Sequence, residues 1–237
     1  MKRFLAILSM CCVLLCPSVR ADEAMAGADQ PTEQASEQDR ARAREVQEAS
    51  LAAELAHYGI EAESAEALIM AAKMMATHRA KAPEGKSVQA EGLKGGDEKA
   101  ANSNEMTPLT LLAKARELAS DNATLMQWAD EVENMARKSS RSPARGLLQG
   151  YYELLPKYRH TMTEQFLGGQ RAYVQVQGEP GAALDIYVFD ANGNPVISSV
   201  GHTTSAWVYW TPNYNAYYQV VVYNRGGWPV NFSVTMQ

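Results

Sequence analysis

Residues 184–196 constrain the fold of this 237-residue chain more than any other stretch. Leu184, Ile186 and Val188 alternate with residues of mixed character, as in a β-strand that buries one of its faces. The run then stops at the sequence Asn-Gly-Asn-Pro (192–195). Asn and Gly adopt turn conformations easily and Pro cannot donate a ladder hydrogen bond, so a tight chain reversal is expected here. The stretch therefore predicts a strand followed by a turn.

The rest of the C-terminal third repeats this pattern of a strand followed by a turn. Segments rich in β-branched and aromatic residues alternate with segments that contain Gly, Pro or Asn. The predicted strands are 150–155, 161–166, 172–177, 184–190, 196–199, 206–210, 217–224 and 230–235. Short strands at this regular spacing are typical of a sandwich or a jelly roll. We therefore expect residues 146–237 to form a jelly-roll-like β-sandwich domain that folds on its own.

Residues 40–145 have helical composition, and the whole chain is predicted to be α+β. Leu51, Leu55 and Tyr58 follow each other at helical spacing, which predicts the buried face of a first helix. A second helix is expected to start near Ser64. A third is expected at Thr107, a hydroxyl N-cap followed by proline.

A fourth helix is predicted after Ser120-Asp121, so that about four helices form two hairpins. Residues 81–105 separate the hairpins and are rich in Gly and charged residues. Such a long segment without an apolar pattern predicts a mobile linker.

The N-terminus has the features of a secretory signal. A short basic segment precedes an apolar run, and Ala21 ends a sequence suited to cleavage. We expect a signal peptide at residues 1–21, a disordered leader at 22–39, and a periplasmic or secreted protein. All three cysteines lie within the signal, so the exported chain is expected to fold without disulfides.

Charge and hydropathy limit the partners. The formal net charge is −5, and no basic cluster suited to nucleic acid or to an anionic membrane is present. The only long apolar run is shorter than the roughly 20 residues that a transmembrane helix requires. A protein or a polysaccharide is therefore the expected partner, and the oligomeric state stays open.

Aromatic residues are concentrated near the C-terminus and offer two interpretations. They are either an exposed platform that stacks against sugar rings or peptides, or cross-strand pairs that stabilise the sandwich. Strand alternation predicts that Tyr218 points into the core and that Gln177 points outward. The candidate ligand-binding residues, all expected to point outward, are Tyr173, Gln175, Trp207, Tyr209, Tyr217 and Tyr223.

The turn after residue 189 has part of a calcium-binding pattern. Asp190, Asn192 and Asn194 have the oxygen spacing of the first half of a calcium loop, and Asp185 is a further nearby acid. The bidentate acid that would complete the loop is absent, because that position is Gly201. A self-bonded turn is the favoured interpretation, calcium is the alternative, and no other cofactor is expected.

No common catalytic motif is present among the four histidines and the serines. Ser198, Ser199, His202 and Asp190 are close in sequence, but a triad is defined in space and not along the chain. We therefore expect a non-enzymatic protein, with an unrecognised hydrolase as an alternative.

The C-terminal region resembles a known family. The sequence LDIYVFDANGN (184–194), followed by Trp-Thr-Pro (210–212) and YQVVVYN (218–224), is similar to bacterial pre-peptidase C-terminal domains. The resemblance covers about residues 150–237 and implies a non-catalytic β-sandwich that serves binding, targeting or solubility. We thus expect a binding module of the envelope or extracellular space. The alternative is a scaffold whose helical half docks a partner protein.

Overall fold

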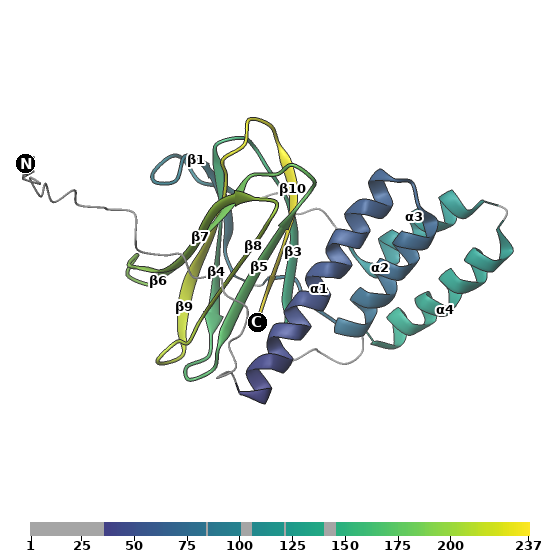
Figure 1. Cartoon of the computed structure of the whole chain (residues 1–237), viewed down its shortest axis with the longest axis horizontal. Helices are drawn as coiled ribbons and strands as arrows, with labels where there is room; N and C mark the ends of the chain where they lie inside the picture. Colours follow the sequence, from purple (N-terminus) through teal and green to yellow (C-terminus); the bar gives the residue numbers. More distant parts are fainter. Residues whose placement is uncertain (1–35, 84, 101–105, 121, 140–145) are drawn as a thin grey trace, which may run out of the picture.

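The computed structural model describes residues 36–83, 85–100, 106–120, 122–139 and 146–237 (Figure 1). The predicted signal peptide and residues 22–35 of the predicted leader lie outside the described residues. No helix in the described part of the chain is long and apolar enough to cross a membrane.

The predicted α+β organisation is confirmed. The described helices are α1 (Glu37–Glu61), α2 (Ala65–His78), α3 (Pro108–Ala119) and α4 (Ala123–Ser139). The described strands are β1 (Ser87–Glu91), β2 (Lys99–Ala100), β3 (Leu148–Leu154), β4 (Tyr158–Phe166), β5 (Ala172–Gly178), β6 (Leu184–Asp190), β7 (Pro195–Thr203), β8 (Ser205–Trp210), β9 (Ala216–Asn224) and β10 (Val230–Met236).

The strands form two antiparallel sheets that pack face to face. One sheet has the order β2-β1-β4-β9-β6-β7 and the other has the order β3-β10-β5-β8. From β3 onward each strand lies in the other sheet from the one before it, as in a jelly roll, except that β6 and β7 form a hairpin within the six-stranded sheet. Leu184, Ile186 and Val188 are fully buried between the sheets, as their alternation predicts.

The predicted linker is wrong in part. Residues 87–91 form β1, which pairs with β4 along its whole length, and Lys99–Ala100 form β2 beside it. Val88 and Ala90 of β1 are buried. A strand of only five residues carries too short an alternation to stand out among Gly and charged neighbours. The six-stranded sheet is thus built partly from sequence that lies between the two helix pairs.

Helix starts follow local capping chemistry. Ser64 and Thr107 are N-caps as predicted, and each accepts a backbone hydrogen bond from the third residue of its helix. Ser36 and Asp39 form a capping box, so α1 begins inside the segment predicted as a disordered leader. The fourth helix is capped by Asn122, next to the predicted Ser120-Asp121, because Asn122 Oδ1 accepts from the backbone N–H groups of residues 124 and 125; Asp121 itself lies outside the described residues.

The predicted buried face of α1 is wrong. Leu51 and Tyr58 are 52% and 59% exposed, and Leu55 is half-buried. The residues that α1 buries are small, and they include Ala49, Ala52, Ala53, Ala56 and Gly59. A methyl group at position 59 would lie 2.8 Å from Leu68 of α2, so the two helices are in close contact there.

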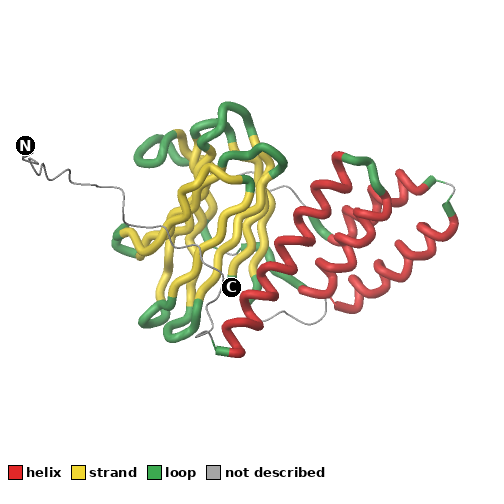
Figure 2. Tube along the Cα trace, viewed as in Figure 1, coloured by secondary structure: helices red, strands yellow, loops and turns green. Residues whose placement is uncertain are grey.

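Helix α1 belongs to two hydrophobic clusters. Its C-terminal half packs with α2, α3 and α4, whereas Ala43, Val46 and Ala49 in its N-terminal half pack against the four-stranded sheet. Figure 2 shows the helices gathered on one side of the sandwich, with α1 closest to the strands. One face of the sandwich is therefore covered by helix.

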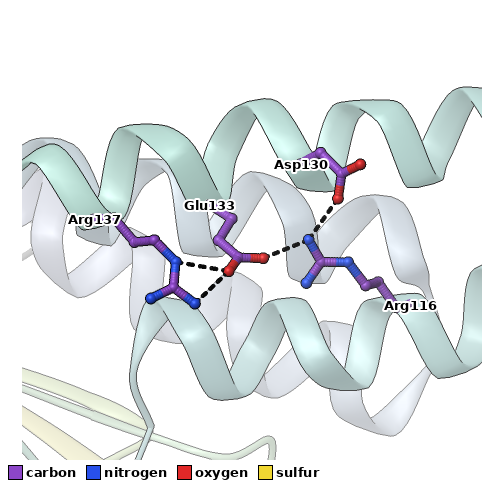
Figure 3. Close-up of polar contacts among 4 residues, drawn as sticks. All are labelled: Arg116, Asp130, Glu133 and Arg137. Atoms are coloured by element: carbon purple, nitrogen blue, oxygen red, sulfur yellow. Dashed lines mark hydrogen bonds and ion pairs between the residues drawn. The ribbon is translucent and has the colours of Figure 1, made fainter.

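An ion-pair cluster joins α3 to α4 (Figure 3). Arg116 Nη2 lies 2.8 Å from Asp130 Oδ1 and 2.6 Å from Glu133 Oε2, and Arg137 donates to the other oxygen of Glu133. The two guanidinium groups hold the pKa of Glu133 below its usual value, with Arg137 the larger cause. The Arg116–Glu133 pair is half-buried and the Arg116–Asp130 pair is more exposed, and surface ion pairs contribute little to stability, so we assign this cluster the role of linking the two helices.

Candidate functional site

The outer face of the four-stranded sheet is occupied by α1. Tyr173 of β5, predicted to point outward to solvent, is 0% exposed and lies under this helix. Its hydroxyl donates to Asp39 O at 2.9 Å, and burial raises its pKa. The alternation of β5 is as predicted, but the side chain meets a helix and not water.

The other candidates on this sheet share the same surroundings. Trp207 and Tyr209 of β8 are half-buried, and their ring centroids lie 5.4 Å and 6.2 Å from that of Tyr173. Gln175 is half-buried between these strands, and Gln177, also predicted outward, is buried. For these residues the structure favours packing over an exposed platform.

The outer face of the six-stranded sheet carries aromatic residues that no described helix covers. Tyr217 of β9 is 56% exposed and Gln219, two residues further, is also exposed, while Tyr218 between them is buried as predicted. Strand register places Gln165 of β4 opposite Tyr217 and Phe189 of β6 opposite Gln219. We call the surface formed by Gln165, Tyr187, Phe189, Tyr217, Gln219 and Tyr223 the open face.

One end of the open face is held by an ion pair between a buried carboxylate and a half-buried arginine. Asp185, proposed above as a metal ligand, is 0% exposed, and its Oδ2 accepts from Arg225 Nε at 2.5 Å. Arg225 Nη2 also donates to the Tyr187 hydroxyl at 2.9 Å, and its guanidinium lies 5.3 Å from the ring centroid of Tyr223. The Asp185 carboxylate, with Tyr187, raises the pKa of Arg225. These contacts fix the tyrosine rings by bonds within the protein.

The geometry of the open face suits an extended ligand. Tyr217 and Tyr223 lie six residues apart on one strand, which places them about 20 Å from each other. Between them the Tyr187 and Phe189 rings stack, with centroids 6.5 Å apart and planes at 16°. The side-chain amides of Gln165 and Gln219 lie on the same surface and can both donate and accept hydrogen bonds.

The predicted calcium residues form a self-bonded turn. Asp190 Oδ1 accepts from the backbone N–H groups of Asn192 and Asn194, at 2.9 Å and 2.8 Å. Its Oδ2 accepts from Asn194 Nδ2 at 2.9 Å. The bonds from Asn194 are the main cause that lowers the pKa of Asp190. Both carboxylate oxygens are thus engaged in shaping the turn, as the favoured interpretation predicts.

Among the described residues, the serine, histidine and aspartate considered for the hydrolase alternative are not seen to form a triad. Ser198 is buried, Asp190 is held in its turn, and the side chain of His202 lies outside what the structure describes. A serine–histidine contact that the sequence did not suggest occurs elsewhere: Ser87 Oγ lies 2.9 Å from His160 Nε2. His160 is fully buried, its Nδ1 has no hydrogen-bond partner, and burial lowers its pKa to about 3. A histidine with so low a pKa is a poor general base at neutral pH.

Sequence reasoning named Tyr217 and Tyr223 but missed the residues that surround them. Gln165, Tyr187, Phe189 and Gln219 join the open face only through the pairing of β9 with β4 and β6. Alternation within each strand identifies which side chains share a side, but it does not identify neighbouring strands. That signal is absent from a single sequence.

No family model matches the chain, and no curated protein matches its sequence. Similar solved structures include the pre-peptidase C-terminal domain of collagenase from Bacillus anthracis, at 11% identity and a TM-score of 0.29, over 38% of this chain and 87% of that chain. PliG of Aeromonas hydrophila, a periplasmic inhibitor of g-type lysozyme, has 14% identity and a TM-score of 0.24, over 38% and 84%.

TmCBM61, solved in complex with β-1,4-galactotriose, has 13% identity and a TM-score of 0.25, over 38% of this chain and 69% of that chain. Since no family model matches and these TM-scores are all below 0.3, the similarities assign no family to this chain.

Proposed function

We propose that this protein is an exported, non-enzymatic binding module that holds a polysaccharide chain against the open face of its six-stranded sheet. The single observation that carries the proposal is the exposed ring of Tyr217, with the half-buried rings of Tyr187, Phe189 and Tyr223 on the same sheet face, which no described helix covers. The predicted signal peptide supports an envelope or extracellular location for such a module.

The chemistry of the open face supports a sugar polymer as the ligand. Tyrosine and phenylalanine rings present flat apolar surfaces that stack on the C–H faces of sugars, and the glutamine amides can bond to hydroxyl groups. The ion pair beneath Tyr187 and Tyr223 holds the rings in place before binding, which lowers the entropic cost of ordering them. A peptide would use the same rings and amides, so the experiment includes it as a separate arm.

Affinity electrophoresis through gels that contain envelope or plant polysaccharides tests the proposal. We expect retardation of the wild-type protein in at least one neutral polysaccharide and its loss in the Tyr217→Ala, Tyr223→Ala double variant. Tyr214→Ala is the matched control, because Tyr214 is 71% exposed but lies in the loop between β8 and β9, outside the strands that carry the open face.

Three results would contradict this function: equal retardation of the double variant and wild type, equal loss in Tyr214→Ala, or binding only to a peptide array. The last result would move the proposal from polysaccharide to protein ligands while keeping the same face.

A specific observation also favours the scaffold alternative. Leu51 and Tyr58 of α1 are exposed at i, i+7, with half-buried Leu55 between them. An apolar stripe of this kind on a helix is a common docking surface for another protein. Leu51→Glu with Tyr58→Glu should abolish capture of a partner from an envelope fraction and leave polysaccharide retardation unchanged. If retardation changes as well, the two surfaces do not act separately.

A further inference from the structure

A second candidate site, which is a pocket, lies where the helices meet the sandwich. It is a pocket of about 350 Å³ between the C-terminal end of α1, the start of α3 and the β5–β6 and β10 side of the sandwich. This volume is at the lower end of the range for small-molecule sites. The pocket is separate from the open face, since none of the open-face residues lines it.

Three residues that line the pocket can accept hydrogen bonds, two through a carboxylate and one through an imidazole nitrogen. They are His57 and Glu61 of α1 and Glu179 of the loop after β5. The Nε2 atom of His57 is buried and has no hydrogen-bond partner. Buried polar atoms are normally bonded, so this nitrogen is an observation that a bound ligand would explain.

His57 lies between opposing electrostatic effects. Burial, the larger effect, lowers its pKa, whereas the charges of Glu179 and Glu61 act to raise it. The imidazole is therefore neutral at neutral pH and one of its nitrogens can accept a hydrogen bond. All three side chains line the same pocket.

Glu179 is held in position by β10. Its backbone N–H donates to Asn231 O at 3.0 Å, and its Oε2 accepts from Asn231 Nδ2 at 3.2 Å. A carboxylate that is oriented before binding loses little freedom when a ligand arrives.

The rest of the pocket is apolar apart from Thr110, Lys114 and Asn231. Ile60, Met106 and Leu111 form the apolar wall. Lys114 is the one cation among the described lining residues, and its Nζ lies 3.4 Å from Glu117 Oε2, which partly neutralises it. The site therefore combines net negative charge with an aliphatic surface.

We propose that this pocket binds a small primary ammonium ligand with an aliphatic body. An ammonium group donates N–H bonds and carries a positive charge, and His57, Glu61 and Glu179 are acceptors that line the pocket. The aliphatic part would lie on Ile60, Met106 and Leu111. The described residues contain no cluster of three or more His, Cys, Asp or Glu side chains placed to hold a metal ion, so the ammonium group is proposed to bond to some of these acceptors and not to all three at once.

Titration of the full chain with pentylamine at pH 7.5, followed by the NMR signals of the histidine rings, tests the proposal. 1-Pentanol and pentanoate are probes of the same length without the positive charge. We expect pentylamine to shift the His57 signal, which a His57→Gln variant assigns, and to bind about tenfold or more tightly than either probe.

Glu179→Gln should weaken pentylamine binding about tenfold or more. The amide oxygen of this variant can still accept from Asn231, so the loop contact is kept. Glu54→Gln is the control, because Glu54 is an exposed carboxylate of α1 that does not line the pocket. The proposal is overturned if amine and alcohol bind equally, if pentylamine leaves His57 unshifted, or if Glu54→Gln weakens binding as much as Glu179→Gln.

Discussion

Both outer faces of the sandwich carry outward-pointing aromatic residues, but a helix covers only one of these faces. On the four-stranded sheet, Tyr173, Trp207 and Tyr209 pack under the N-terminal half of α1. On the six-stranded sheet, Tyr217 projects from the surface with Gln165 and Gln219 beside it. Both sets alternate with core residues in the same way. An outward aromatic residue is thus a binding candidate only after it is known whether another element covers its face.

The largest loss of stability is expected when α1, which covers the four-stranded sheet, is removed together with β1. Sequence alone predicts that residues 146–237 fold on their own, but the structure gives this fragment neither β1 nor α1. It would expose the edge of β4 and the ring of Tyr173, which in the full chain is completely buried. We therefore expect the fragment to melt without cooperativity, or to associate, in circular dichroism and light-scattering measurements.

A cooperative melt of the monomeric fragment near the melting temperature of the full chain would contradict this expectation. It would show that the sandwich is stable without α1 on its four-stranded sheet, and that both outer faces tolerate contact with water.

A single-residue comparison isolates the same difference. Tyr173→Ala should lower the free energy of unfolding by about 3–5 kcal/mol, as is typical when a buried aromatic site is emptied. Tyr217→Ala removes an exposed ring and should change it by about 0.5 kcal/mol or less. Denaturant unfolding of both variants beside the wild type measures the contrast. Equal losses would mean that the Tyr217 ring is structural and that the open face is not free for a ligand.

Acid should destabilise the interior that both faces share. Burial lowers the pKa of His160 to about 3, so the folded state excludes a proton that the unfolded histidine binds below about pH 6.5. Stability is therefore full above pH 6.5 and falls as the pH drops from there toward 3. The loss from this residue is about 2 kcal/mol at pH 5.

Denaturant midpoints from pH 7.5 to 4.5 test this prediction. His160→Gln keeps a polar partner for Ser87 and cannot titrate, so its midpoint should depend less on pH than that of the wild type. His57, whose pKa is also lowered by burial, adds a smaller effect of the same sign. A wild-type midpoint that does not change across this range would contradict the burial of His160.

The smallest effect is expected from metal removal. Because both oxygens of Asp190 already accept hydrogen bonds within the turn, chelator should leave the melting temperature unchanged. A calcium-dependent rise in that temperature would show that the turn opens to bind the ion. It would also add a ligand site at the end of β6, next to the open face.

The sequence predicts local structure well in this chain because local signals dominate there. The alternation in β6 and the N-caps at Ser64 and Thr107 are complete within a few residues, and the structure has them where they are expected. The covered face, by contrast, depends on where α1 docks. Alanines form its contact surface, and an alanine stripe is weaker as a sequence signal than Leu51, Leu55 and Tyr58, which face away from the core or lie at its edge.

The candidate sites show the same limit more strongly. Tyr217 and Tyr223 follow from alternation, but Gln165 and Phe189 reach the open face only through strand pairing. The pocket at His57 joins residues from α1, α3, the β5–β6 loop and β10. No short-range pattern connects such distant positions, so this site is visible only in three dimensions.

The position of β1 in the chain has a consequence for the order of folding. As the polypeptide emerges from its N-terminus, α1, α2 and β1 are synthesised before β4, β5 and β10, against which β1 and α1 pack. The N-terminal half of α1 and the strand β1 therefore stay partly exposed until the strands that they pack against have been synthesised. Contacts between distant parts of a sequence slow folding. We propose that this chain is exported. Slow folding would then keep the polypeptide unfolded, and able to pass through an export channel, until β10 has been synthesised.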